Sequence, residues 1–322
     1  MRWEGHRESS NIEDRRDGGD SGGFGGGDDG SSGGYAGGMG GLPINIGGGG
    51  IGTIIVMLII AWVLGINPLT LLSGTQVGPS QAPQSHARNE RPPQRTASHN
   101  DQLTRFVAVV LGDTEDRFRE IVPAQAGDLV PKAAGMRYEE PKLVLFSGST
   151  RSPCGAANAA TGPFYCPSDR KVYIDLAFYD ELKTRFRAPG DFAQAYVVAH
   201  EIGHHIQNMI GILPAFNQAR ARMSEKEQNR ASVKVELQAD CFAGVWAHHA
   251  QKDRDFIEPG DIDEALNAAS RIGDDSIQKT MRGYVVPDSF THGSAAQRQR
   301  WFKIGFESGR MGACDTFKAP SL

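Results

Sequence analysis

One continuous apolar run interrupts an otherwise polar N-terminal third of the chain. The run from Ile51 to Ile66, IGTIIVMLIIAWVLGI, carries no charge and has no polar face. Flanking residues extend it to the length of about 20 residues that a bilayer-spanning helix needs. A buried core helix is the alternative, but such a helix would show a polar face. The run also begins too far along the chain for a cleaved signal peptide. The pattern predicts one transmembrane helix, which contacts the lipid bilayer through residues 47–72.

The segments on either side of this run lack periodic apolar positions. Residues 1–46 contain a charged head followed by a tract of Gly, Ser and Asp, and residues 73–100 are rich in Pro, Gln and Ser. Such sequences bury too little apolar surface to offset the entropy lost on ordering. We therefore expect a disordered head and a flexible tether. Four arginines in the head favour a cytoplasmic N-terminus.

Residues 101–322 carry the periodic patterns of a folded domain. A helical spacing of apolar residues covers 101–122, and β-branched and aromatic residues predict strands at PKLVLFSGS and at 171–178. The pattern after residue 191 is mainly helical. We therefore expect an α+β domain in which a small sheet precedes a helical half. Three of the helices are predicted to begin at capping residues: Asp191, Asp261 with Glu264, and Ser294 with Gln297.

Charge and cysteine content narrow the class of protein. The 34 basic and 38 acidic residues give a net charge of −4, without the basic stripe that nucleic-acid binding requires. All four cysteines lie in the folded part, and an even count in a domain outside a membrane favours two disulfides. We expect Cys154 to pair with Cys166, and Cys241 with Cys314. Two other pairings are open, as are four buried free thiols.

The strongest chemical signal is the sequence HEIGH in an apolar helix. His200 and His204 are four residues apart, so a helix places both imidazoles on one face, where they can share one zinc ion. Glu201 lies further round the helix and can reach a water molecule at the metal. This motif is short enough to arise by chance, so a third ligand is needed to support it.

A second helix, predicted from Ser232 to Ala250, offers that ligand. Glu236 and Asp240 are also four residues apart, and they interrupt a segment rich in apolar residues. Glu236 can bind the metal while Asp240 accepts a hydrogen bond from a liganding histidine. A solvent-facing helix surface is the alternative interpretation. Small side chains should let this helix pack closely against the first: Ala239, Ala243 and Gly244.

These motifs resemble those of the gluzincin metallopeptidases, such as the thermolysin and HtpX-like types. The closer resemblance is to the bacterial neutral zinc metallopeptidase family (YpfJ-like), and it is carried by CGAANAATGPFYCPSDRKVYIDLAFYDEL, GDFAQAYVVAHEIGHHIQ, ELQADCFAGVWA and CDTF. The head MRWEGHRESSNIEDRR and the single apolar run are also similar. The resemblance implies a zincin-like catalytic domain with one Zn²⁺ held by His200, His204 and Glu236, and with Glu201 as general base.

The expected function is that of a membrane-anchored zinc metalloendopeptidase acting on peptide or protein substrates. A tetrahedral oxyanion needs a donor besides zinc, and His292 is the candidate, with Tyr284 as a weaker one. HtpX-like peptidases are similar in placing an Arg on a late helix, which Arg298 would match. The strand at 171–178 is either the edge that pairs with an extended substrate or an ordinary core strand. The remaining histidines of the domain are expected to be structural: His205, His248 and His249.

Two alternatives belong to other functional classes. The zinc could be structural, in a membrane-anchored binding or scaffold module without proteolysis, although structural zinc sites usually use four Cys and His ligands. A zinc hydrolase acting on a small amide or ester is the second alternative. The expected location is the bacterial inner (cytoplasmic) membrane, with a single crossing, a cytoplasmic N-terminus and a periplasmic or extracellular catalytic domain.

Overall fold

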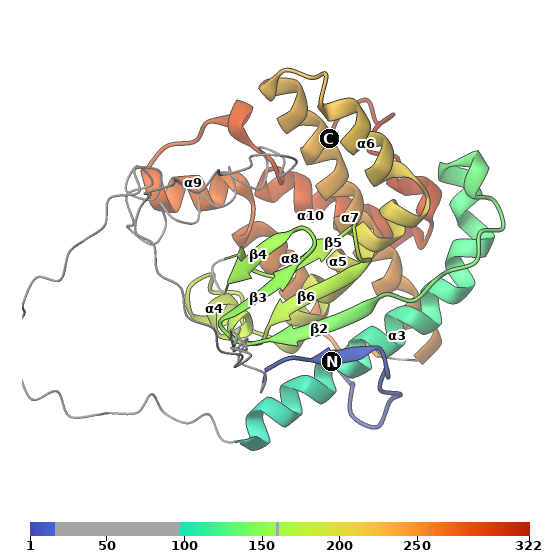
Figure 1. Ribbon diagram of the computed structural model, residues 1–322, viewed down its shortest axis with the longest axis vertical. Coiled ribbons are helices and arrows are strands. Elements are labelled where there is room, and N and C mark those ends of the chain that lie inside the picture. The colour runs from blue at the N-terminus through green and yellow to red at the C-terminus, as the bar shows by residue number, and fades with distance from the viewer. Residues whose placement is uncertain (17–96, 159–160, 255) are drawn as a thin grey trace, which may run out of the picture.

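The computed structural model describes residues 1–16, 97–158, 161–254 and 256–322. A four-stranded sheet and eight helices make up most of this described part (Figure 1). The sheet order is β1-β2-β6-β5. Strands β1, β2 and β6 are parallel, and β5 is antiparallel to β6. A separate hairpin is formed by β3 and β4. The strands are β1 (Ile12–Asp14), β2 (Lys142–Phe146), β3 (Ser149–Ser152), β4 (Gly155–Asn158), β5 (Phe164–Cys166) and β6 (Lys171–Asp175).

The helices form the larger layer. They are α3 (Ala97–Leu129), α4 (Ala177–Thr184), α5 (Asp191–Met209), α6 (Ile212–Arg220), α7 (Glu225–Arg254), α8 (Asp261–Arg271), α9 (Asp274–Arg282) and α10 (Ala295–Ser308). Short 3₁₀ turns are η1 (Pro131–Ala133), η3 (Pro287–Ser289) and η4 (Met311–Cys314). Helix α5 packs against α3, α7 and α8, and α10 packs along α7.

Burial of both faces of the sheet explains why residues 143–146 of β2 are all apolar. Leu143 and Leu145 of β2 belong to the main core with the helices, whereas Val144 and Phe146 point to the opposite face and pack with Tyr173 of β6. Successive residues of a strand face opposite sides of a sheet, so both faces here are covered. The predicted strand at 171–178 is therefore not an edge strand: its β6 lies between β2 and β5, and α4 begins at Ala177.

Residues 1–16 are an ordered part of this fold. Strand β1 pairs with β2, which lies more than 120 residues further along the chain, and the blue segment in Figure 1 runs beside β2 and α3. Arg7 forms ion pairs with Glu115 and Asp116 on α3, at 2.7 and 2.9 Å. Lys171 of β6 binds Glu13 at 2.7 Å. Charges that suggest a disordered head in the sequence are thus satisfied by distant partners.

The predicted fold class is therefore wrong in two respects. The fold is mixed α/β rather than α+β, and residues 12–14 of the predicted disordered head supply the first strand of its largely parallel sheet. None of the helices in the described part of the chain has the length and apolar character that a bilayer crossing requires. The predicted transmembrane helix at 47–72 lies outside the described residues.

Helix ends and disulfides test the local predictions. Ser294 and Gln297 form the expected capping box of α10. Asp191 and Asp261 instead lie inside the first turns of α5 and α8, whose N-caps are glycines without a capping side chain. Helix α3 begins at Ala97, inside the predicted tether 73–100. Both expected disulfides, Cys154–Cys166 and Cys241–Cys314, are confirmed. The second joins α7 to η4.

Candidate metal centre

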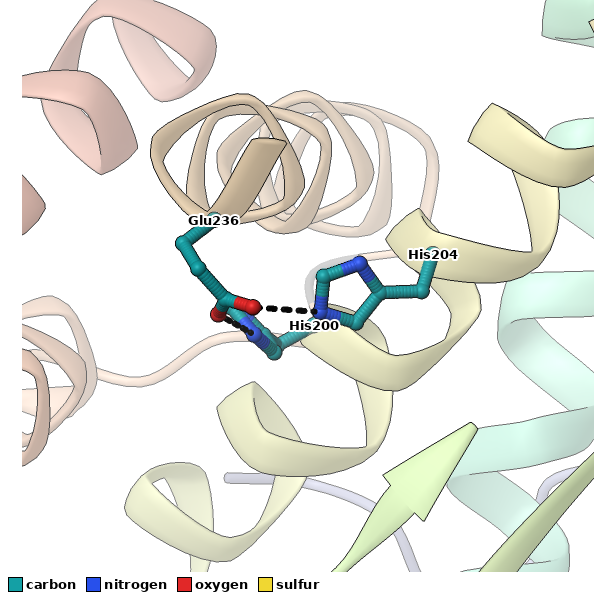
Figure 2. A group of neighbouring side chains, drawn as sticks. All are labelled: His200, His204 and Glu236. Atoms are coloured by element: carbon teal, nitrogen blue, oxygen red, sulfur yellow. Dashed lines mark hydrogen bonds and ion pairs between the residues drawn. The ribbon is translucent and has the colours of Figure 1, made fainter. Parts of the chain in front are cut away.

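His200 and His204 project from consecutive turns of α5 toward Glu236 on α7 (Figure 2). The His200 Nε2 atom lies 3.2 Å from Glu236 Oε2, and the His204 Nε2 atom lies 3.6 Å from Glu236 Oε1. One ring nitrogen of His200, one of His204 and one carboxylate oxygen of Glu236 lie within 4.8 Å of one another. The structure thus brings a carboxylate into contact with a histidine that lies 36 residues before it in the chain.

A glycine in the HEIGH sequence allows α7 to come this close. A Cβ atom at Gly203 would lie 2.9 Å from the carbonyl oxygen of Ala239 and 3.2 Å from its Cβ atom. The two helices therefore touch almost backbone to backbone, one turn from Glu236. The sequence correctly assigns Ala239 to this contact. Gly244 packs elsewhere, because its missing side chain makes room for the backbone of Phe302 on α10.

Asp240 lies directly behind His200 in a fully buried polar network. Its Oδ1 atom is 2.8 Å from His200 Nδ1, and Tyr196 donates its hydroxyl hydrogen to the same oxygen. Arg298 of α10 donates to both carboxylate oxygens, at 2.8 and 2.9 Å. Burial favours the neutral acid, but the charges of Arg298 and His200 outweigh it and hold the pKa of Asp240 far below its usual value. An ionised Asp240 accepts the Nδ1 hydrogen of His200, which leaves Nε2 to face Glu236.

His204 has an equivalent partner that sequence patterns do not reveal. Its Nδ1 atom lies 2.9 Å from the side-chain oxygen of Gln207, and Gln207 in turn donates to the carbonyl of Val235 and to Gln238. Gln207 is fully buried. The spacing of three residues from His204 is the only signal in the sequence, and many unrelated glutamines in helices share it.

The electrostatics of the three groups suit a divalent cation. Burial disfavours the imidazolium of His200, but Asp240 and Glu236 outweigh burial and raise its pKa to about 10. Burial also opposes the charge of Glu236, yet His204 and His200 hold its pKa well below the usual value. The arrangement therefore attracts positive charge, which a proton or a metal can supply. Two imidazoles and one carboxylate are the donor set of catalytic zinc sites that keep one open position.

Comparison with known proteins places the chain in a family. Residues 1–317 match the family model described as "Putative neutral zinc metallopeptidase". The chain belongs to this family. Zn²⁺ is the cofactor that membership implies, and His200, His204 and Glu236 fit it.

Two similar proteins have names that give no activity. The protein YpfJ of Escherichia coli K12, named as uncharacterised, is 45% identical over 317 residues, which is 98% of this chain and 99% of YpfJ. The protein Rv2575 of Mycobacterium tuberculosis H37Rv, also named as uncharacterised, is 42% identical over 214 residues, 63% of this chain and 71% of its own. No solved structure matches the chain.

In this member of the neutral zinc metallopeptidase family, Glu201 is buried next to the two histidines. Its side chain follows His200 directly on α5, and the residue is 7% exposed. Burial raises the pKa of Glu201, although the neighbouring imidazoles oppose the shift. A carboxylate with a raised pKa is better able to take up a proton near neutral pH.

His292 lies in the turn before α10 and is held by Asp274. Its Nδ1 atom is 3.2 Å from Asp274 Oδ1, and its backbone nitrogen donates to Asp274 Oδ2 at 2.7 Å. Burial opposes a charge on His292, but Asp274 and also Glu236 raise its pKa, so the ring carries a proton more readily than a free histidine. Tyr284 differs: it is 61% exposed in the segment after α9. Sequence reasoning did not anticipate Asp274.

The other histidines of the domain have structural partners, as expected. His205 contacts the carbonyl of Glu139 at 2.6 Å, and burial lowers its pKa to about 4. His248 and His249 bond to carbonyl oxygens at the end of α10.

Proposed function

We propose that the protein is a zinc-dependent endopeptidase that hydrolyses peptide bonds in peptide or protein substrates. The observation that carries this proposal is the convergence of His200, His204 and Glu236 beside the buried Glu201, in a member of a zinc metallopeptidase family. In the proposal, the first three residues hold one Zn²⁺ and Glu201 is the general base.

The roles of the side chains follow from their environments. When bound, Zn²⁺ lowers the pKa of a coordinated water and polarises the substrate carbonyl. Glu201 accepts the proton of the attacking water and then gives it to the leaving amine, a transfer that its raised pKa favours. Asp240 and Gln207 each accept the Nδ1 hydrogen of one histidine, which directs both Nε2 atoms to the same point.

His292 is proposed to stabilise the oxyanion of the tetrahedral intermediate. Asp274 binds its Nδ1 side and supports the protonated ring, so the Nε2 hydrogen is free to donate to a developing negative charge. The charge of Glu236 helps to raise the pKa of His292, and the charge of His292 helps to lower the pKa of Glu236. The expected result for His292→Ala is a loss of kcat with unchanged zinc content.

The β5 edge of the described sheet offers a place for an extended substrate. Strand β5 forms one edge of the described sheet, and it packs against α5 through Tyr165, which accepts a hydrogen bond from Asn208 and donates one to Nδ1 of His205. Peptide backbones commonly add to such an edge as a further strand.

The decisive experiment is a comparison of Glu201→Gln with wild type. We expect Glu201→Gln to bind one zinc ion per chain, measured by atomic spectroscopy, and to lose at least about 100-fold in cleavage of an unfolded protein such as casein. Glu225→Gln, on the exposed first turn of α7, is the matched control and should cleave normally. Full activity in Glu201→Gln would contradict the proposal.

Wild type that binds zinc and cleaves no peptide would favour the scaffold alternative, and cleavage restricted to small amides or esters would favour a non-peptidase hydrolase.

The two disulfides support a proposed location in an oxidising compartment, because cytosolic thiols are kept reduced.

A further inference from the structure

The α-amino group of Met1 is buried in a cluster of carboxylates on the catalytic domain. Its nitrogen lies 2.9 and 3.0 Å from the two side-chain oxygens of Asp191, 3.2 Å from Glu258 and 3.3 Å from Asp261. Asp191 is the first residue of α5, the helix that carries the HEIGH sequence. Asp261 begins α8. The N-terminus of the chain therefore joins two helices.

Neighbouring contacts fix the nitrogen in this position. The Met1 side chain is 8% exposed and packs into the main hydrophobic core. The backbone nitrogen of Arg2 donates to the carbonyl of Phe256 at 2.9 Å. Trp3 packs edge-to-face on Phe106 of α3. Several independent contacts thus position the amine, which is not a loose terminus that happens to meet an acidic surface.

The carboxylates need a cation at this place. Oxygen atoms of Asp191, Asp261 and Glu264 lie within 4.8 Å of one another. Burial, together with the neighbouring negative charges, raises the pKa values of Asp261 and Glu264. The ammonium group supplies the opposing charge, and its three hydrogens match the acceptors from Asp191, Glu258 and Asp261.

We propose that Asp191, Glu258 and Asp261 form a binding site for a free α-ammonium group at Met1, and that this site is filled only when Met1 is retained, uncapped and not preceded by other residues. An acyl group on this nitrogen removes the charge and adds bulk at a fully buried atom. A formyl group would have to be hydrolysed first: water adds to the amide, formate leaves, and the amine takes up a proton. This inference is independent of the proposed peptidase activity.

The test compares full-length chains that differ only at the N-terminus. Cleavage of a fusion by a protease that leaves no extra residue yields the native Met1 terminus, and a second fusion leaves Gly-Ser before Met1. A third chain carries Gly-Ser at the C-terminus as control. We expect the N-terminal extension to lower Tm by about 5 °C, because it displaces a buried ammonium group from Asp261, which is itself buried. Trypsin should cleave the head of the extended chain roughly tenfold faster or more, because local opening of a destabilised segment governs its proteolysis.

Asp191→Asn with Asp261→Asn shows whether these carboxylates mediate the effect. In that background the N-terminal extension should cause no further loss of Tm, because the site is already disabled. Asp263→Asn is the matched control: it removes the same charge from an exposed position of the same helical turn and should leave the effect of the extension intact.

Two outcomes would overturn the proposal. One is equal Tm and equal cleavage of the chain that begins at Met1 and the extended chain. The other is stabilisation of the extended chain by a divalent metal ion that Asp191→Asn abolishes, because the cluster would then be a cation site.

Discussion

Asp240→Asn should damage both the stability of the protein and its affinity for zinc. Asp240 is fully buried and accepts two hydrogen bonds from Arg298, a residue that is itself 3% exposed. The substitution keeps the shape of the side chain but leaves the guanidinium as an unpaired buried charge. Breaking a buried ion pair in this way costs about 3–5 kcal/mol. For a domain of this size we therefore expect a fall in Tm of about 10 °C.

A second substitution separates the two effects. Arg298→Met removes the unpaired charge, so the double variant Asp240→Asn with Arg298→Met should regain more than half of the lost stability. Zinc affinity should remain low in the double variant, because an asparagine side chain cannot hold His200 as the carboxylate does, and losing such a partner typically costs about 10–100-fold in affinity. Denaturant unfolding of EDTA-treated protein measures the stability, and competition with a chromogenic chelator measures the affinity.

The result that would refute this reasoning is specific. If Asp240→Asn alone left the free energy of unfolding within about 1 kcal/mol of wild type, Arg298 would not depend on Asp240 for its charge balance. If the double variant regained zinc affinity together with stability, the carboxylate would not orient His200.

Other parts of the structure give three further predictions. Gly203→Ala should weaken zinc binding about tenfold or more, because a Cβ atom 2.9 Å from the carbonyl oxygen of Ala239 pushes α7 and Glu236 away. The change in Tm should be small, because the better helix propensity of alanine, worth about 1 kcal/mol, offsets part of the overpacking. A normal zinc affinity would contradict the close approach of the two helices. Asp191, Asp261 and Glu258 outweigh burial and raise the pKa of the Met1 ammonium above its ordinary 8.0. The contribution of the ammonium to stability should therefore be complete below about pH 8 and disappear as pH rises through the raised pKa of the folded state. Tm should then become equal at high pH for the chain that begins at Met1 and the Gly-Ser-extended chain, and a difference in Tm that stays constant with pH would contradict this prediction. Replacing Cys241 and Cys314 by serine removes a disulfide between residues 73 positions apart, and the free energy of unfolding should fall by about 4 kcal/mol because the unfolded chain gains entropy. Denaturant unfolding measures this loss. A loss below about 1 kcal/mol would show that the unfolded chain gains little freedom.

Helical periodicity explains why so much of the metal centre can be predicted from sequence. The positions of His200 and His204, and of Glu236 and Asp240, follow from a spacing of four residues within single helices, and the structure brings these four side chains together. The partners from other segments do not follow from any local pattern. Arg298 can be noticed in the sequence, but its pairing with Asp240 depends on how α10 packs along α7.

The head shows where composition misleads. A segment with few apolar residues and many charges predicts disorder when each charge is assumed to face water. Here Arg7 pairs with residues more than 100 positions away, and β1 is stabilised by hydrogen bonds to β2. Strand pairing between distant segments depends on tertiary structure, so a single sequence contains little trace of it.

Asp191 and Asp261 show the same ambiguity at the level of single residues. An aspartate at the start of a helix fits a capping role, and it equally fits a role as partner for a cation, because both exploit its acceptor oxygens. The structure decides between them by placing Met1 at both residues. Asp191 lies nine residues from His200 on α5, a distance of about 13 Å along a rigid helix. Displacing the head should therefore lower the stability of the domain while leaving zinc affinity nearly unchanged, whereas Asp240→Asn, which acts on His200 directly, should lower both.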